Sequence, residues 1–265
     1  MTNIFIFGIN GKMGSLTKEL ALKDSDICVV GGAYKKDNEC VLEYFEPSLR
    51  IKDEANLRVK DEYTPTKNTP KVDVIIDFSA CDAYNDVVRL CKKHNCRVIV
   101  ASTGHTTSQI DSFKDLAKTL PVMIAPNLSI GVNSFIRIVE FATQALNDSE
   151  IEIVEYHHSK KADCPSGTAK QICNSIIAKN HELYSILRTT KRNKSEIGIS
   201  SVRCGSIVGR HDVIFGLENE TITLTHNAIN KQTFAIGAIK ASKWLNSKPN
   251  GLYTMNDYMN EVVFT

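Results

Sequence analysis

Short apolar runs and longer amphipathic segments alternate over the first half of the chain. The apolar runs, typical of strands covered on both faces, are residues 4–7, 27–33, 72–79, 97–103 and 121–125. The segments with apolar side chains at helical spacing are residues 12–23, 81–94 and 107–119. Residues 34–71 are polar and poorly periodic, and they predict a short element at most. Strands separated by such helices predict βαβ units, a parallel sheet and an α/β fold.

The pattern changes after Asn127. The helices predicted in this half are residues 132–146, 166–178 and 232–245. Polar and apolar side chains alternate over residues 151–156, and the later strand-like runs are residues 200–204, 212–217 and 221–227. A charged stretch, residues 189–196, lies between them. Alternation of this kind favours an antiparallel or mixed sheet, so a second domain is expected to begin near Asn127.

Composition narrows the class of protein. The 265 residues are 42% hydrophobic and 23% charged, with a net charge of +2, which predicts a globular protein without the basic field that nucleic acid requires. No apolar run approaches the roughly 18 residues of a membrane span, and the first residues lack the pattern of a signal peptide. The eight cysteines form no C-x-x-C pair. We therefore expect a cytoplasmic protein, with neither nucleic acid nor membrane as a partner.

A glycine-rich turn lies between the first predicted strand and the first predicted helix. Its residues are Gly8, Ile9, Asn10, Gly11, Lys12, Met13 and Gly14. The spacing G-x-x-G-x-x-G is a variant of the dinucleotide fingerprint, in which glycines let the backbone approach a pyrophosphate at a helix N-terminus. An ordinary tight turn is the alternative. The strand before it and the helix after it favour dinucleotide binding.

The second strand ends without the acid that usually follows this fingerprint. An NAD-selective site places Asp or Glu there, about 20 residues on, to accept the ribose 2′-hydroxyl. Here the chain reads Tyr34, Lys35 and Lys36. Two cations suit a 2′-phosphate and Tyr34 could stack on adenine, whereas the alternative is a solvated loop. Lys35 and Lys36 are therefore candidate cofactor ligands, and NADPH is expected to serve at least as well as NADH.

Residues 155–169 concentrate chemically active side chains. His157 and His158 end the alternating strand and Lys161 follows them. A helix then begins near Gly167 and Thr168, whose free amides can bind a carboxylate. The segment thus holds a candidate proton donor, a cation and an anion-binding helix end. A zinc site is disfavoured because no further ligand stands at a suitable spacing, so no metal is expected. The remaining alternative is a surface loop with incidental histidines.

At this point the sequence resembles the 4-hydroxy-tetrahydrodipicolinate reductase (dihydrodipicolinate reductase) family. Residues 155–169 match its motif E-x-H-H-x-x-K-x-D-x-P-S-G-T-A at every fixed position. The resemblance extends to residues 8–14, 77–79, 102–104, 125–133, 208–211 and 251–253. It implies a Rossmann-like dinucleotide-binding domain, residues 1–127 and 238–265. It also implies a central α+β domain, residues 128–237, that binds substrate and builds a homotetramer.

The resemblance also implies roles for individual residues. His157 would exchange the proton, and Lys161 would steady the transition state. The residues that would hold substrate carboxylates are His158, Gly167 and Thr168. The residues that would line NADPH or NADH are Gly8, Ile9, Asn10, Gly11, Lys12, Met13, Ala101, Ser102, Thr103, Ala125, Pro126, Asn127 and Leu128. The family commonly has Gly, Ala and Phe at positions 101, 126 and 128, where this chain has Ala, Pro and Leu.

The reaction implied is reduction of a cyclic imine dicarboxylate to tetrahydrodipicolinate, in the biosynthesis of diaminopimelate and lysine. Two other readings remain open at this stage. One is a different two-domain NAD(P)-dependent dehydrogenase, acting on homoserine or a sugar. The other is a dinucleotide sensor that keeps the fold without activity.

Overall fold

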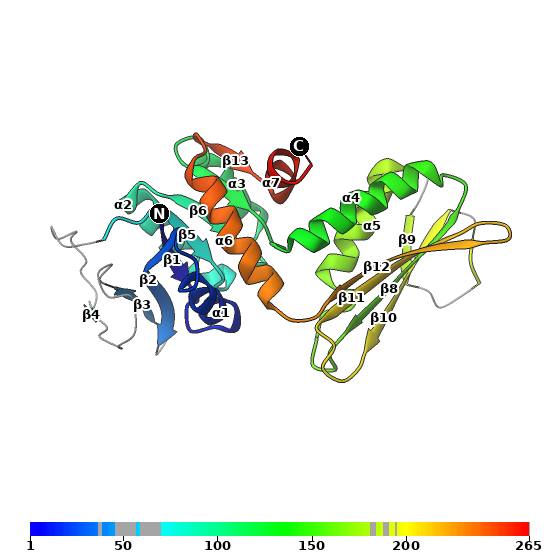
Figure 1. Ribbon diagram of the computed structural model, residues 1–265, viewed down its shortest axis with the longest axis horizontal. Coiled ribbons are helices and arrows are strands. Elements are labelled where there is room, and N and C mark those ends of the chain that lie inside the picture. Colours follow the sequence, from blue (N-terminus) through cyan, green and yellow to red (C-terminus); the bar gives the residue numbers. More distant parts are fainter. Residues whose placement is uncertain are drawn as a thin grey trace. The chain divides into compact units, whose positions relative to one another are not determined.

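The computed structural model describes residues 1–36, 39–45, 57–58, 70–180, 184–187, 191–193 and 195–264. Its contacts divide the chain into two compact units (Figure 1). Unit 1 contains Met1–Ser129 and Gln232–Thr265, and unit 2 contains Ile130–Lys231. In the described part of the chain, no helix is both long and apolar enough to cross a membrane.

Unit 1 is built on an eight-stranded sheet of order β13-β7-β6-β5-β1-β2-β3-β4. Its strands are β1 (Thr2–Phe7), β2 (Ile27–Lys36), β3 (Glu39–Tyr44), β4 (Leu57–Arg58), β5 (Val74–Asp77), β6 (Arg97–Val100), β7 (Pro121–Ile124) and β13 (Gly251–Tyr253). Its helices are α1 (Lys12–Ala21), α2 (Tyr84–His94), α3 (Thr107–Leu116), α6 (Gln232–Asn246) and α7 (Met255–Val262), with a short 3₁₀ turn η1 (Cys81–Ala83).

The sheet is parallel from β13 to β2, and antiparallel at the β3–β4 edge. The predicted parallel sheet is present from β13 to β2, whereas the expectation of a short element at most over residues 34–71 is wrong, because β2 extends to Lys36 and β3 and β4 follow it. Strand β2 continues through Lys36 and pairs with β3, so that Ala33 lies opposite Leu42. Side chains on this edge are only partly buried, which removes the continuous apolar signal on which the prediction depended. Residues 46–56 and 59–69 lie outside the described part.

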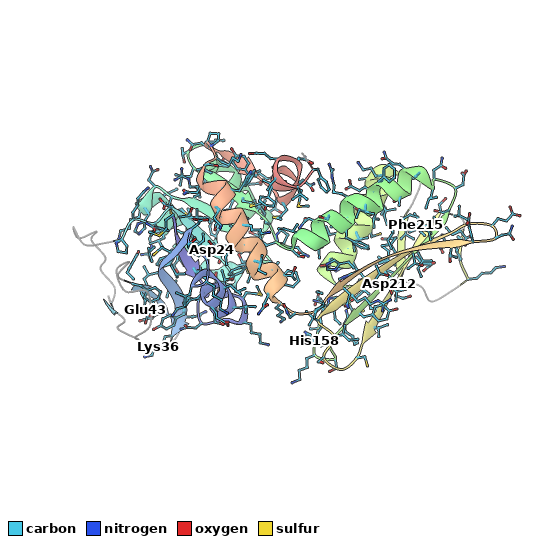
Figure 2. The ribbon with its side chains drawn as sticks, in the orientation of Figure 1. Asp24, Lys36, Glu43, His158, Asp212 and Phe215 are labelled. Carbon is cyan, nitrogen blue, oxygen red and sulfur yellow. The ribbon has the colours of Figure 1, made fainter. Side chains whose placement is uncertain are left out.

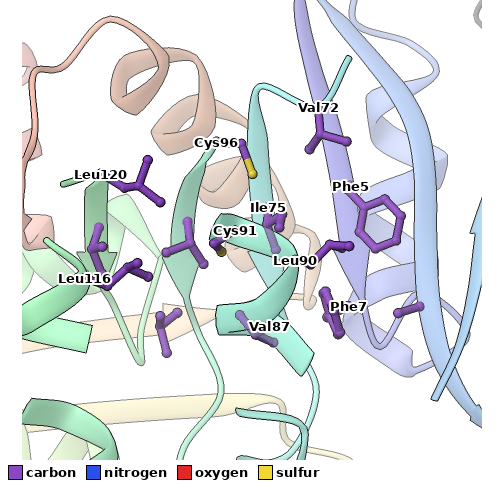
Figure 3. Packing of buried hydrophobic residues seen from close by; sticks show 14 of the residues in the cluster. Phe5, Phe7, Val72, Ile75, Val87, Leu90, Cys91, Cys96, Leu116 and Leu120 are labelled. Carbon is purple, nitrogen blue, oxygen red and sulfur yellow. The ribbon is translucent and has the colours of Figure 1, made fainter. Parts of the chain in front are cut away.

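Both faces of the central strands are covered. Phe5 and Phe7 of β1 pack with Val87 and Leu90 of α2 and with the buried side chains of α3 (Figure 3). Ile4 and Ile6 alternate with them and are also fully buried. Helices α1 and α6 pack against each other and against β1. This double coverage explains why the strands read as unbroken apolar runs.

The chain returns to unit 1 through α6, which packs against α1, β1, β5 and β6. Strand β13 then adds to the free edge of β7, in parallel. The predicted domain division between residues 237 and 238 falls inside α6, which the structure keeps whole within unit 1. Gly237 faces Leu128 so closely that a Cβ there would lie 1.8 Å from its carbonyl oxygen, and this contact fixes the middle of the helix on the turn after β7.

Unit 2 has a five-stranded mixed sheet of order β12-β11-β8-β10-β9. Its elements are α4 (Ile130–Ala145), β8 (Glu150–His157), α5 (Gly167–Lys179), β9 (Tyr184–Leu187), β10 (Glu196–Arg203), β11 (Gly209–Gly216) and β12 (Thr221–Ala228). Strands β8, β9 and β10 are parallel to one another, and β11 is antiparallel to both of its neighbours, β8 and β12. Helices α4 and α5 pack on one face, over a core that includes Ile151, Ile153 and Phe215.

Candidate functional site

The glycine turn of unit 1 has the geometry that close approach of a ligand requires. Gly8 has φ +74°, a conformation that other residues rarely adopt. A Cβ at Gly14 would lie 2.2 Å from the Gly8 carbonyl oxygen, so helix α1 can begin directly against the turn only because both are glycine. Amides at the start of α1 therefore lie beside the carboxyl end of β1, as in a dinucleotide site.

A pocket of about 410 Å³ opens at this turn. Its lining comes from the end of β1 and the glycine turn, from β2 and β3, and from the segment between β5 and the start of α2. The lining residues are Phe7, Gly8, Asn10, Gly11, Ala33, Tyr34, Lys35, Cys40, Ser79, Ala80, Asp82, Ala83 and Asp86. Of the predicted cofactor residues, Gly8, Asn10, Gly11 and Lys35 are in this lining. The volume and the glycine backbone fit part of a dinucleotide.

An acid does reach the pocket, from a segment that the fingerprint does not cover. Asp82 in η1 pairs with Lys35, with 2.9 Å between Oδ2 and Nζ, and both side chains are more than half exposed. The Lys35 ammonium lowers the pKa of Asp82. Lys36 is exposed at the end of β2 and does not line the pocket (Figure 2). The end of β2 holds no acid, as the sequence shows, and the carboxylate beside Lys35 comes instead from η1.

The turns after β5 and β6 are tied together by one buried carboxylate. Asp77 accepts hydrogen bonds from the Ser79 amide, at 2.9 Å, and from the hydroxyls of Ser79 and Ser102. Ser102 also contacts Nε2 of His105, at 2.8 Å. Ala101 is half-buried and Thr103 is exposed beside this network. Asp77 thereby fixes the carboxyl ends of two neighbouring strands.

The turn after β7 is built by its own hydrogen bonds. The Ala125 amide donates to the Val100 carbonyl, at 2.9 Å, and the Asn127 side chain accepts from the Ser129 amide, at 3.0 Å. Ala125 and Leu128 are buried, while Pro126 is exposed. Neither this turn nor Ile9, Lys12 and Met13 contributes to the lining of the 410 Å³ pocket.

In unit 2, the alternation of β8 carries the core face directly into a polar cluster. Ile151 and Ile153 point into the core, and Glu155 and His157 follow them on the same buried face. Nδ1 of His157 forms a hydrogen bond with Oε2 of Glu155. The strand ends at His157, so His158 begins the next turn and is half-buried at the end of β8 (Figure 2).

Glu155 is fully buried and is held from three directions. Arg203 at the end of β10 donates from Nη2 to Oε1, at 2.7 Å, and from Nη1 to Oε2, at 3.0 Å. The Ser166 amide donates to Oε1, at 3.2 Å. Burial by itself would raise the pKa of Glu155, but the hydrogen bonds, above all those from Arg203, lower it to about 2. The carboxylate is therefore ionised at neutral pH.

A second histidine lies beside the first. The rings of His157 and His211 are 5.3 Å apart and meet edge to face, and His211 Nε2 is 3.3 Å from the Ser166 hydroxyl. Burial, followed by the neighbouring His157, lowers the pKa of His211 to about 4, so this ring is neutral. Burial also lowers the pKa of His157, against the opposing effect of Glu155. A Cβ at Gly209 would lie 3.1 Å from His157 Nε2, so the absent side chain leaves room at that atom.

The start of α5 forms the other wall of the cluster. The Ser166 hydroxyl caps the helix by accepting from the Ala169 amide, at 3.1 Å. Gly167 is exposed and a Cβ there would meet nothing within 4 Å. Lys161 pairs with Asp163, at 2.7 Å, and although burial opposes the effect, this lysine lowers the pKa of Asp163. The predicted His157, His158, Lys161, Gly167 and Thr168 thus all belong to unit 2, in the strand end, turn and helix start of one segment.

Glu155, His157 and His211 also present ligand atoms within 4.8 Å of one another, a spacing that could suit a metal. The Glu155 oxygens, however, already accept from Arg203, Ser166 and His157. A metal would compete with an arginine for the same carboxylate. The donor set therefore fits a hydrogen-bonded cluster better than a metal centre.

Sequence reasoning assigned no role to several residues that contact these sites. They are Asp77, Ser79, Asp82, Glu155, Arg203, Gly209 and His211. Asp77, Ser79, Gly209 and His211 lie in segments that carry the family resemblance, and Glu155 opens its long motif, so the motifs held a signal for these five. Asp82 and Arg203 carried none, because only the tertiary structure brings them beside Lys35 and Glu155.

Comparison with known proteins matches both units. The family model of the N-terminus of dihydrodipicolinate reductase matches residues 2–128, and that of its C-terminus matches residues 131–259. The 4-hydroxy-tetrahydrodipicolinate reductase of Caldanaerobacter subterraneus subsp. tengcongensis is 36% identical over 262 residues, which cover 97% of this chain and 98% of that protein. The enzyme of the same name from Alkaliphilus oremlandii is 35% identical over 267 residues, covering 98% and 100%.

Solved structures agree on the fold. Dipicolinate-bound dihydrodipicolinate reductase from Paenisporosarcina sp. TG-14 superposes with a TM-score of 0.72 at 22% identity, covering 96% of this chain and 97% of that one. An amine dehydrogenase from Mycobacterium smegmatis gives 0.59 at 10% identity, covering 95% and 94%. With both family models matched and the relatives aligned over nearly their full length, the chain belongs to the dihydrodipicolinate reductase family.

Proposed function

We propose that this protein is a 4-hydroxy-tetrahydrodipicolinate reductase, which uses NADH or NADPH to produce tetrahydrodipicolinate for diaminopimelate and lysine synthesis. The observation that carries the proposal is the segment from the end of β8 to the start of α5. It brings a proton-exchanging histidine, a lysine and a helix N-terminus into one unit. Family membership sets aside the homoserine and sugar dehydrogenase readings.

Unit 1 fits the cofactor. The glycine turn and the start of α1 would hold the pyrophosphate, with Lys35 and Asp82 at the adenosine end of the pocket. When bound, the reduced nicotinamide supplies the hydride, and the protein supplies position and charge. Asp77 holds the turns after β5 and β6 together through Ser79 and Ser102, and these turns would contact the rest of the dinucleotide.

Unit 2 would hold the two carboxylates of the substrate. One would lie against the amides of Gly167 and Thr168, where the helix dipole favours an anion and the glycine leaves open space. Lys161 and His158 would neutralise the other. Asp163 now holds the Lys161 ammonium, so a substrate carboxylate would replace one anionic partner of that lysine with another.

His157 would complete the reduction. Hydride addition to the conjugated imine leaves an electron-rich enamine, and a carbon atom of that enamine must gain a proton. Nε2 of His157 would donate it, since Nδ1 is engaged by Glu155. Solvent then returns a proton to the ring, and the substrate loses water over the whole conversion.

One assay tests this function directly. The purified protein is expected to oxidise NADPH or NADH only when the hydroxylated substrate is generated in the same vessel by its synthase. Because the substrate is unstable, the matched control omits the synthase alone. Oxidation of the cofactor at the same rate without the synthase would contradict the proposal. No oxidation of either cofactor would contradict it as well and would favour the dinucleotide sensor.

We also propose that the chain forms a homotetramer through the sheet of unit 2. Helices α4 and α5 cover one face of that sheet, and the opposite face carries the half-buried side chains of Glu152, Val154 and Tyr156. Light scattering at micromolar protein should give four times the 29.4 kDa mass of the chain. A monomer under these conditions would contradict this arrangement.

A cytoplasmic location is part of the same proposal. All eight cysteines are free thiols, which suits a reducing compartment, and NADH and NADPH are supplied there. Cell fractionation should find the protein with cytoplasmic markers. Recovery from a secreted or membrane fraction would contradict this location.

A further inference from the structure

The Glu155 carboxylate accepts hydrogen bonds from Arg203 and Ser166 as well as from His157. It has no exposed surface, and its two oxygens accept from His157, from both terminal nitrogens of Arg203 and from the Ser166 amide. Arg203 is fixed in turn, since its Nη2 donates to the Asp163 carbonyl at 2.6 Å and its Nη1 to the Val202 carbonyl at 2.9 Å. The end of β10 therefore anchors a carboxylate on β8.

We infer that Glu155 and Arg203 are positioning residues for His157, which hold its ring with the proton on Nδ1 and Nε2 directed to the reacting carbon. This inference rests on the proposed function. It adds two residues that do not touch the substrate, and it assigns one ring atom to the proton transfer.

The tautomer follows from hydrogen-bond chemistry. An ionised carboxylate can only accept, so the contact between Glu155 and His157 requires a proton on Nδ1. In the neutral ring Nε2 then carries a lone pair, and in the charged ring it carries the transferable proton. Gly209 leaves space next to Nε2, where any side chain would begin 3.1 Å away.

The charges around His157 work in opposing directions. Glu155 on the same strand favours the charged ring, whereas burial, Lys161 in the following turn and Arg203 on β10 disfavour it. His211 on β11 faces the ring edge to face and is itself neutral. Removal of the Glu155 charge leaves only opposing effects, so the pH at which His157 loses its proton must fall.

Replacement of Glu155 by Gln tests the tautomer sharply. The amide has one acceptor oxygen. At the Oε1 position this oxygen keeps two donors, Arg203 Nη2 and the Ser166 amide, and only Arg203 Nη1 loses its acceptor at Oε2. The amide nitrogen is then left at the Oε2 position, where it can only donate to His157 Nδ1. The ring must move its proton to Nε2, which is the wrong tautomer for accepting a proton there from solvent.

The same strand offers a matched control. Glu152 lies three positions earlier on the opposite face of β8, and it too pairs with an arginine, with 2.6 Å between its Oε1 and Nη1 of Arg192. Glu152→Gln therefore removes the same charge from the same strand beside the same type of partner. It stands away from His157, on the face proposed for the tetramer, so light scattering first compares its mass with that of wild type. With the assembly unchanged, turnover and its pH dependence should match wild type.

The experiment compares wild type, Glu155→Gln, Arg203→Lys and Glu152→Gln in the full-length protein. With reduced cofactor and substrate, kcat should fall roughly 100-fold in Glu155→Gln and less in Arg203→Lys. The acidic pKa of kcat should move to lower pH in Glu155→Gln, whereas Arg203→Lys keeps both charges beside His157 and should leave that pKa near its wild-type value. The KM for cofactor should stay near that of wild type, because the cofactor pocket is in the other unit. In Glu155→Gln, a fall in kcat without any movement of the pH profile would reduce Glu155 to a structural role and overturn the inference.

A second readout needs no turnover and is made on the wild-type protein. In wild-type protein labelled with ¹⁵N in its seven histidines, the His157 ring should show protonated Nδ1 at a pH above its titration. The signal is assigned by its loss in His157→Gln. Protonated Nε2 in wild type overturns the inference, even if the reductase is fully active. If the wild-type protein has no reductase activity but its His157 ring is protonated at Nδ1, the proposed function is contradicted and the assignment of the tautomer still holds.

Discussion

Under the proposed function, two side chains of opposite charge, Lys35 and Asp82, would lie at the adenosine end of the cofactor. Lys35 suits a 2′-phosphate, and Asp82, its partner at 2.9 Å, suits the 2′-hydroxyl of NADH. The 2′-phosphate of NADPH would contact Lys35 in place of Asp82, and the 2′-hydroxyl of NADH would contact Asp82 in place of Lys35. We therefore expect the protein to use both cofactors, with NADPH at least as effective as NADH.

Substitutions at this pair should move cofactor preference in opposite directions. Asp82→Asn frees the lysine for a phosphate and should raise the preference for NADPH. Lys35→Glu should shift it towards NADH by about tenfold, because a charge-assisted contact is lost and a like charge replaces it. The measurement is kcat/KM for each cofactor. Lys36→Glu is the control, since it makes the same change next to a residue of the lining. An equal shift in both lysine variants would show a general charge effect instead.

At the other site, the proton-exchanging atom is the critical feature. His157→Gln removes the group that would protonate the enamine, so turnover should fall by about 10²–10⁴-fold. Binding of NADPH, measured by fluorescence titration, should hardly change, because the pocket of unit 1 does not include this residue. Near-normal turnover would remove His157 from the role assigned to it.

At the level of elements, the N-terminus of α5 is expected to bind a carboxylate. A planar 2,6-dicarboxylate should compete with the substrate, and its binding should weaken in Lys161→Ala, in Thr168→Val and in Gly167→Val. The lysine should matter most, because a full charge is lost from a partly desolvated site. Since a Cβ at Gly167 meets nothing within 4 Å, the valine should fold normally and act only on the ligand.

Calorimetric titration of the dicarboxylate, with reduced cofactor bound, measures these effects. Lys160→Ala is the matched control, because that lysine is exposed beside Lys161. Wild-type affinity in all three site variants would place the carboxylate pocket elsewhere.

How far the elements can be predicted depends on how each strand is buried. Strands β1, β5, β6 and β7 are covered on both faces and read as apolar runs, and β8 alternates because one face is open. Strand β3 lies at a partly solvated edge, and β13 has only three residues, so neither left a pattern. For the candidate site, continuity along the chain matters instead. The residues from His157 to Thr168 form one continuous segment with a recognisable motif, whereas Asp82 and Arg203 lie in elements distant in sequence from Lys35 and Glu155.

The whole molecule should lose stability with acid in two steps. His211 has its pKa lowered from 6.5 to about 4 in the folded state, so its neutral form contributes stability that is lost as pH falls from 6.5 to 4. Glu155 has its pKa lowered from 4.5 to about 2, so its contribution is complete above 4.5 and is lost as pH falls towards 2. Urea unfolding at a series of pH values should show both declines.

The variant Glu155→Gln separates the two steps. It should be less stable than wild type at neutral pH, and its stability should depend less on pH below 4.5, while the decline above 4 remains. If the variant keeps the full acid dependence of wild type, another carboxylate is responsible for the lower step.

The return of the chain through α6 has a consequence for how the protein is made. Unit 2 is one uninterrupted stretch of chain, Ile130–Lys231, and it leaves the ribosome before α6 does. Until that helix emerges, the surfaces of β1, β5 and β6 on which it packs lie bare on the nascent chain. Unit 2 can therefore begin to fold while unit 1 still lacks α6, β13 and α7. During that interval the uncovered sheet of unit 1 is the surface on which a chaperone would act.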